Sequence, residues 1–152
     1  QIIKNKNESI SGITSPWVYS GMQFASFCWH VEDLYMYSVN YMHKGAAKTW
    51  YIVPGEYKEE FDKVIKIKYG ELFIKNPALM YHIVLTMNPM ELVKSGVPVY
   101  RTEQKPREFI ITFPKAYHAG FSHGWNVSEA VNVALVDWIP TGLQALEDYA
   151  SD

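Results

Sequence analysis

The chain has 152 residues, of which 48% are hydrophobic and 20% charged, and this balance excludes a disordered chain and predicts one globular domain with a buried core. The net charge of −2 gives no sign of nucleic-acid binding, and no apolar run approaches the roughly 20 residues needed to span a membrane. The single cysteine, Cys28, excludes an internal disulfide and favours a reducing compartment.

The first part of the chain predicts β-strands. Residues 17–30 are rich in aromatic and apolar side chains and are interrupted by Gly21. Residues 35–42 and 48–53 have the composition of two further strands, and the HKGAA stretch between them predicts a hairpin. The PG pair that follows ends the second strand.

The remainder of the chain mixes helices with more strands. Apolar residues at helical spacing predict a helix over 56–67, and residues 70–87 fit no element clearly. Asn88 as a cap and Pro89 in the first turn predict a short helix over 88–95. Further strands are predicted over 97–104, 108–113 and 129–138, and a closing helix over 141–150 with a capping box of Thr141 and Gln144. This order predicts a mostly β fold, a sandwich or barrel, with a helical insert and a C-terminal helix.

The stretch WHVED, residues 29–33, contains a histidine and a glutamate two positions apart. In a strand, His30 and Glu32 would point to the same face. His118, which follows the strand predicted over 108–113, would complete a group of two histidines and one carboxylate, the facial triad that holds iron(II) with open positions. Taken alone, the pair is more often a surface ion pair or a core histidine whose hydrogen bonds are satisfied than part of a metal site.

The predicted hairpin points to an anion site beside this triad. If the hairpin is symmetric about residue 44, residue 40 pairs with residue 48 and residue 38 with residue 50. Ser38, Asn40, Lys48 and Trp50 then share one face of two adjacent strands. A lysine beside an amide and a hydroxyl fits the far carboxylate of a 2-oxo acid whose other end chelates the metal. The alternative is an exposed face with Lys48 in solvent.

The other tryptophans and histidines are predicted to be structural. We expect four of the five tryptophans to pack in the core and not to form a cage for a methylated ammonium: Trp17, Trp29, Trp125 and Trp138. His43 is expected to be solvated in the hairpin turn. His82 and His123 are expected to be structural, as lone histidines usually are.

Three stretches carry a family resemblance: FCWHVEDLYMYSVNYMHKGAAKTWYIVPG, TMNPMELVKSGVPVYRTEQKPREFIITFPKAYHAGFSHGWN and EAVNVALVDWIPTG. They resemble the JmjC domain of the Jumonji histone lysine demethylases, and most of all its JARID-type branch, over residues 12–150. The resemblance implies a double-stranded β-helix, a cupin-like jelly roll. It also implies that residues 1–152 are a single catalytic domain of a larger protein, without the JmjN segment and reader modules of that branch.

The resemblance also implies an iron(II)- and 2-oxoglutarate-dependent dioxygenase that hydroxylates N-methyl groups of lysine and releases formaldehyde. It assigns the metal to His30, Glu32 and His118. It assigns the 2-oxoglutarate pocket to Lys48, Asn40 and Phe27, with Ser38, Trp50 and Asn132 at further pocket positions. It places Tyr19 near the methyl-lysine.

The expected substrate is the tail of histone H3 methylated at lysine 4, and the expected location is the nucleus, with chromatin contacted through modules outside this chain. No membrane or direct nucleic-acid contact is expected. Three alternatives stay open: a JmjC hydroxylase that leaves a stable alcohol, a catalytically silent JmjC scaffold module, and a generic cupin metalloprotein. The complete triad and the pair Asn40 and Lys48 argue against the last two.

Overall fold

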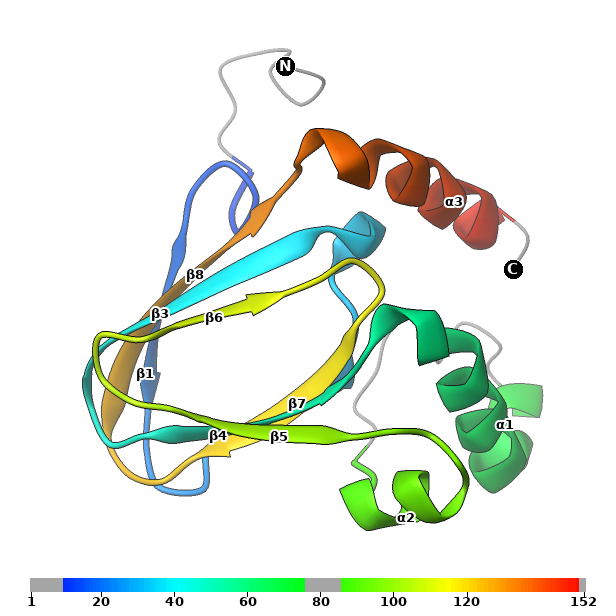
Figure 1. The fold of residues 1–152 in the computed structure, drawn as a ribbon, viewed down its shortest axis with the longest axis horizontal. Coiled ribbons are helices and arrows are strands. Elements are labelled where there is room, and N and C mark those ends of the chain that lie inside the picture. The colour runs from blue at the N-terminus through cyan, green and yellow to red at the C-terminus, as the bar shows by residue number, and fades with distance from the viewer. Residues whose placement is uncertain (1–9, 76–85, 151–152) are drawn as a thin grey trace.

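Two four-stranded antiparallel sheets form the body of the protein (Figure 1). The structure is a computed structural model that describes residues 10–75 and 86–150. The strands are β1 (Trp17–Gly21), β2 (Ser26–His30), β3 (Tyr37–Gly45), β4 (Lys48–Val53), β5 (Tyr100–Gln104), β6 (Phe109–Thr112), β7 (Tyr117–Ser122) and β8 (Asn126–Val133). The helices are α1 (Lys58–Lys75), α2 (Pro89–Lys94) and α3 (Ile139–Ala150), with short 3₁₀ turns η1 (Asp33–Tyr35), η2 (Gly55–Tyr57) and η4 (Val136–Trp138).

Consecutive strands alternate between the two sheets, except that β4 and β5 are neighbours in the same sheet. One sheet has the order β1-β8-β3-β6 and the other β2-β7-β4-β5. The chain therefore crosses from sheet to sheet at every connection except the one between β4 and β5, which is the winding of a jelly roll and matches the expected mostly β, cupin-like fold. No helix in the described parts of the chain is long and apolar enough to cross a membrane.

The predicted hairpin between β3 and β4 is wrong. β3 pairs with β6 and β8, whereas β4 pairs with β5 and β7, so the two strands face each other across the sandwich. The connection is held by the neighbouring loop, because the N–H of Ala46 donates to the carbonyl of Trp125 at 2.7 Å. Gly45 has φ of 102°, and a Cβ there would lie 2.3 Å from that same carbonyl oxygen. A side chain cannot occupy this close approach.

Several predicted boundaries also differ. The strand predicted through residue 138 ends at Val133, and helix α1 continues to Lys75, past the predicted end at residue 67. Helix α3 begins at Ile139, directly after η4, so the capping box predicted at Thr141 is wrong. Helix α2 is confirmed, with the Asn88 side chain accepting from the N–H of Met90 at 2.9 Å.

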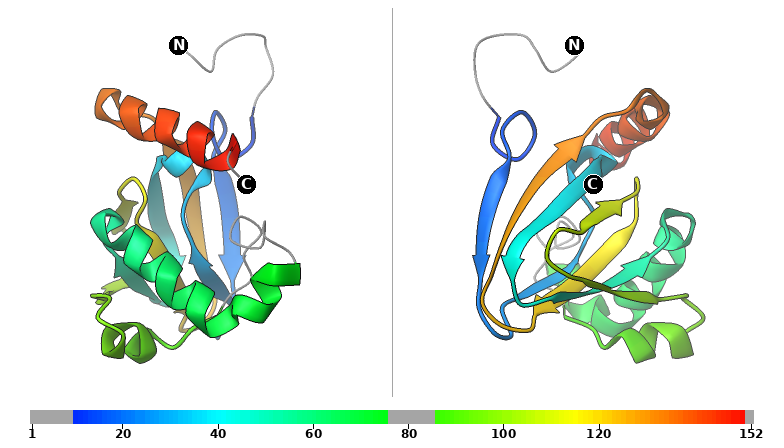
Figure 2. Two further views of the ribbon diagram at one scale, coloured as in Figure 1. Left: turned by 90° about the vertical axis from the view of Figure 1, so that its right-hand side faces the viewer. Right: turned by 60° about the vertical axis from the view of Figure 1, so that its left-hand side comes forward.

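Helices α1 and α2 cover the outer face of the β2-β7-β4-β5 sheet (Figure 2). The hydrophobic core lies in this layer and contains Trp29, Val53, Phe61, Ile65, Leu92, Val97 and Tyr117. The space between the two sheets is lined instead by buried polar residues, which include Ser38, Asn40, Lys48, Thr112, His118, Ser122 and Ser128. Because buried polar groups cost stability unless they are paired, so many of them between the sheets indicate a functional site there.

Candidate metal centre

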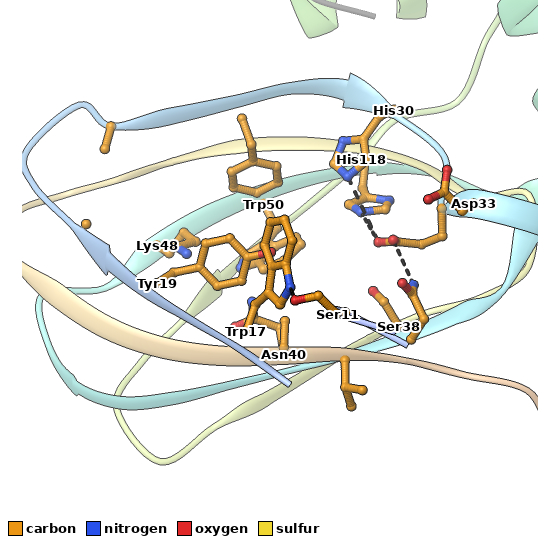
Figure 3. A pocket seen from close by; sticks show the side chains of 18 of the residues that line it. Ser11, Trp17, Tyr19, His30, Asp33, Ser38, Asn40, Lys48, Trp50 and His118 are labelled. Carbon is orange, nitrogen blue, oxygen red and sulfur yellow. Dashed lines mark hydrogen bonds and ion pairs between the residues drawn. The ribbon is translucent and has the colours of Figure 1, made fainter. Parts of the chain in front are cut away.

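His30, Glu32 and His118, hereafter the triad, converge in the space between the sheets. Figure 3 shows the two histidines together at one end of this space. His30 ends β2 and lies opposite His118 of β7, and their ring centroids are 4.2 Å apart. Glu32 Oε1 lies 3.1 Å from His118 Nε2 and 4.0 Å from His30 Nε2. One ligand atom from each residue lies within 4.8 Å of the others, which is the spacing needed to hold one ion.

The backbone fixes the orientation of both imidazoles. His30 Nδ1 lies 2.8 Å from the carbonyl oxygen of Cys28, and His118 Nδ1 lies 3.0 Å from the carbonyl oxygen of Ala116. A carbonyl oxygen can only accept, so each Nδ1 carries a proton and each Nε2 faces the triad. The Nε2 of His118 contacts Glu32 Oε1 and gives its lone pair when a metal ion takes the place of that contact. Metal-binding histidines are held in this way in proteins.

Glu32 is held as a carboxylate. Asn132 Nδ2 donates to Glu32 Oε2 at 2.8 Å. Burial acts to raise the pKa of Glu32, but the hydrogen bond and charge of His118, the Asn132 amide and the charge of His30 outweigh it and lower the pKa to about 2. Burial and the neighbouring His118 lower the pKa of His30. Both groups therefore stand in the form that binds a cation.

The donor set fits a divalent transition-metal ion. Two neutral imidazole nitrogens and one carboxylate oxygen are the ligands of the facial triad that holds non-haem iron(II). Two other described histidines lie elsewhere. His43 belongs to β3 and contacts Glu129 at 2.9 Å on the surface, and His123 contacts the hydroxyl of Thr49 at 2.7 Å. His82 lies outside the described residues.

A cavity of about 530 Å³ opens from the triad and contains every further pocket residue expected from the sequence. Its lining includes Phe27, Ser38, Asn40, Lys48, Trp50, Asn132 and Tyr19. The grouping of Ser38, Asn40, Lys48 and Trp50 is therefore confirmed, although it arises across the two sheets and not within a hairpin. Figure 3 shows Lys48 at the opposite side of the cavity from the triad.

Lys48 is a buried cation without a carboxylate. Its side chain is buried, and its Nζ donates to the hydroxyl of Ser128 at 3.3 Å. The rings of Phe27 and Trp50 lie 5.8 and 6.0 Å from Nζ. Among the described residues no acidic side chain pairs with it. Burial lowers the pKa of Lys48, as expected for an ammonium that lacks a counter-charge.

Gln104 was not predicted as part of the site but orients two of its residues. Its Nε2 donates to Asn40 Oδ1 at 3.1 Å, and its Oε1 accepts from Trp50 Nε1 at 3.0 Å. The amide nitrogen of Asn40 is therefore available as a donor to the cavity. Gln104 is on β5, and only the pairing of Gln104 with Lys48 across β4 and β5 brings it here. Nothing in the local sequence signals that long-range pairing.

One wall of the cavity is aromatic. Trp17 and Tyr19 line it with ring centroids 6.0 Å apart, and Trp17 Nε1 donates to the Ser11 hydroxyl. Trp17 is 49% exposed and Trp125 56%, so the prediction that these two tryptophans pack in the core is wrong. Trp29 is buried as predicted.

The chain is similar to known proteins over most of its length. A family profile described as "JmjC domain, hydroxylase" matches residues 17–133. The chain is 49% identical over 148 residues to lysine-specific demethylase 5B of Gallus gallus, covering 97% of this chain and 10% of that protein. It is 50% identical over 143 residues to lysine-specific demethylase 5D of Homo sapiens and to that of Pan troglodytes, covering 94% of this chain and 9% of each relative. The chain thus spans about a tenth of the length of the curated relatives it matches.

Proposed function

The chain belongs to the JmjC family, and on that premise we propose that it is the catalytic domain of an iron(II)- and 2-oxoglutarate-dependent histone lysine demethylase. The observation that carries the proposal is one cavity with the triad at one end and a buried lysine, unpaired with any described acidic group, at the other. The similarity to proteins named lysine-specific demethylases supports the same reaction.

In this proposal the triad holds the metal. His30 and His118 give their Nε2 lone pairs and Glu32 gives its carboxylate, while Asn132 keeps that carboxylate in place. When bound, iron(II) with 2-oxoglutarate and dioxygen would supply the oxidising chemistry: one oxygen atom enters an N-methyl C–H bond, and the other converts 2-oxoglutarate to succinate and carbon dioxide. The hydroxymethyl group is then lost from the amine as formaldehyde.

The far carboxylate of 2-oxoglutarate is assigned to Lys48. An ammonium that has lost water and has no described carboxylate beside it gains a charge-assisted hydrogen bond when that carboxylate arrives. The amide of Asn40 and the hydroxyl of Ser38 line the same wall and supply further donors, and Phe27 packs its ring edge against Trp50 at 4.7 Å to exclude water. One end of 2-oxoglutarate would thus bind the metal held by the triad, and its far carboxylate would bind Lys48.

Methyl-lysine is expected along the aromatic wall of the cavity, with its methyl group directed to the triad. Tyr19 and Trp17 present ring surface there, which suits a methylated ammonium. Burial and the nearby charge of Glu32 raise the pKa of Tyr19, so its hydroxyl keeps its proton and can donate. We further propose histone H3 methylated at lysine 4 as the substrate and the nucleus as the location, because the resemblance is to the JARID-type branch.

A second candidate is a JmjC hydroxylase that leaves a stable alcohol on its substrate, which the description of the matching family profile favours. It uses the same triad, so the product separates the two. A demethylase releases formaldehyde, whereas a hydroxylase adds the mass of one oxygen atom to the peptide.

The test is an assay of the full-length protein with iron(II), ascorbate and 2-oxoglutarate on histone H3 peptides trimethylated at lysine 4, lysine 9 or lysine 36. We expect formaldehyde and loss of methyl mass, fastest for the lysine-4 peptide. Faster turnover of another peptide would refute the lysine-4 assignment alone. Hydroxylated peptide without formaldehyde would support the hydroxylase. His118→Ala, which removes one triad nitrogen, should abolish every product, and His43→Ala, a surface histidine, should leave turnover unchanged.

A further inference from the structure

Glu32 lies outside both sheets. Strand β2 ends at His30, where the strand-like stretch of the sequence also ends, so His30 and Glu32 do not share a strand. Glu32 follows with extended angles of φ −70° and ψ 152° before η1 begins. The hydrogen bonds of the sheet therefore fix His30 and His118 but not Glu32. The position of its carboxylate depends on the backbone that comes next.

That backbone is unusual. Leu34 has φ of 52° and ψ of 23°, and Tyr35 also has φ of 52°. Non-glycine residues rarely adopt this left-handed conformation, and it persists only where surrounding contacts impose it. The turn after Glu32 is therefore held from outside.

The C-terminal segment, residues 136–150 of η4 and α3, makes the contacts that hold this turn. Trp138 Nε1 donates to the carbonyl of Leu34 at 2.9 Å, and the Leu34 N–H donates to the hydroxyl of Tyr149 at 3.1 Å. The hydroxyl of Tyr35 donates to Asp148 at 2.8 Å. Gly142 lets the Trp138 ring lie against α3, because a Cβ there would be 2.4 Å from the indole. Figure 1 shows α3 lying over η1.

The end of β8, directly before the C-terminal segment, also contacts Glu32. Asn132, which donates to Glu32 Oε2, is at the end of β8, and β8 leads into η4. Asn132 Nδ2 also lies 3.3 Å from the carbonyl of Tyr37, whose hydroxyl donates to Asp137 at 2.6 Å. Contacts to the side chain of Glu32 and to its following backbone thus arise from one continuous segment.

We propose that the C-terminal segment is a positioning element for the metal centre, and that Trp138 is its principal positioning residue. By holding Leu34 in the left-handed conformation, it fixes where the Glu32 carboxylate points. The inference rests on the proposed function, because the direction of Glu32 matters only if the triad binds a metal.

Trp138→Phe in the full chain tests this, with manganese(II) affinity measured by titration calorimetry. The change removes the N–H while keeping an aromatic ring, and we expect affinity to fall about three- to tenfold, the loss that goes with one neutral hydrogen bond. Tyr69→Phe is the matched control. It removes an equivalent bond to the carbonyl of Thr86, 3.2 Å long and remote from the triad, and should leave affinity unchanged. Asn132→Ala, which removes a direct contact to Glu32, should lower affinity about ten- to a hundredfold.

Two further variants test the proposal even if Trp138→Phe disturbs the folding of the chain. Tyr149→Phe removes the acceptor of the Leu34 N–H and should also weaken manganese(II) binding. Leu34→Gly in the Trp138→Phe background should restore it, because glycine adopts positive φ without strain. Affinities of Trp138→Phe and Tyr149→Phe equal to that of Tyr69→Phe would overturn the proposal, as would a double variant no better than Trp138→Phe. A wild-type chain that binds no manganese(II) would instead refute the proposed function.

Discussion

Lys48 places a positive charge inside the protein with no acidic partner among the described residues. Its contacts are the hydroxyl of Ser128 and the rings of Phe27 and Trp50. None of these contacts replaces the hydration that an ammonium loses on burial. The residue is therefore expected to cost stability in the ligand-free protein and to repay it only when an anion binds.

Lys48→Met should show both effects. We expect the free energy of unfolding of the ligand-free protein to rise by about 1 kcal/mol, because an apolar side chain of similar length replaces an uncompensated charge. The affinity for 2-oxoglutarate should fall about ten- to a hundredfold, since a bond to a charged group is worth about 1.5–3 kcal/mol. Urea unfolding and titration calorimetry measure the two quantities. Lys44→Met, at an exposed lysine, should change neither.

The pH dependence follows from the lowered pKa of Lys48. Between that pKa and the unfolded value of about 10.4, the unfolded chain binds more protons than the folded one, so stability rises with pH across this window. The cost of the buried charge is fully present at lower pH. Lys48→Met should remove this rise, and an unchanged pH profile in the variant would contradict the account.

At the scale of elements, β7 lies unusually close to β4 and to the ring of Phe27 at Gly120. A Cβ on Gly120 would lie 2.1 Å from the carbonyl oxygen of Thr49 and 2.6 Å from the ring of Phe27. Phe27 lines the cavity, and His118 is two residues away from Gly120 on the same strand. Glycine is the residue that lets β4, β7 and the Phe27 ring meet.

Gly120→Ala should therefore destabilise the protein by about 1–3 kcal/mol, the usual cost of forcing a group into packed structure. Gly70→Ala is the matched control. Gly70 lies in α1 with nothing within 4 Å of its Cβ position, so alanine there should stabilise by about 0.5–1 kcal/mol. Chemical unfolding compares the two variants, and wild-type stability for Gly120→Ala would show that the strands have room to separate.

The elements also show where sequence reasoning reached its limit. Alternation and turn residues located most of the strands and all three helices. β7 was missed, because His118 and Gly120 interrupt the strand pattern and glycine is more often a turn signal. The hairpin was wrong because HKGAA has the composition of a tight turn, whereas Gly45 is fixed by the loop at Trp125, eighty residues further along the chain. A contact between residues so far apart in the chain cannot be predicted from the local sequence pattern.

At the scale of the whole molecule, the site belongs to both sheets. The triad histidines and Lys48 come from the β2-β7-β4-β5 sheet, and Ser38, Asn40 and Asn132 come from the β1-β8-β3-β6 sheet. The residue identities could be taken from the family resemblance, and their convergence depends on the winding of the jelly roll. The hydrogen bonds of Gln104 and the contacts of η1 with α3 required the structure.

Ligands that bridge the sheets should stabilise them together. With manganese(II) and 2-oxoglutarate, amide hydrogen exchange should slow in β2, β3, β4 and β7, while α2 on the outer face should change little. A ligand present at a hundred times its dissociation constant adds about 2.7 kcal/mol to the unfolding free energy. Slowing restricted to one sheet would contradict a shared site. His30→Ala, which removes a triad nitrogen, should abolish the effect of the metal.

The ring of Trp50 stacks near His118, with centroids 5.9 Å apart and 29° between planes, and also lies beside Lys48. An indole in that place is a built-in optical probe. A paramagnetic ion held by His118 quenches a neighbouring excited indole, and a carboxylate arriving at Lys48 alters the field around it. The difference in intrinsic fluorescence between the wild type and Trp50→Phe, which keeps the other four tryptophans, can therefore report occupancy of each end of the cavity without a label.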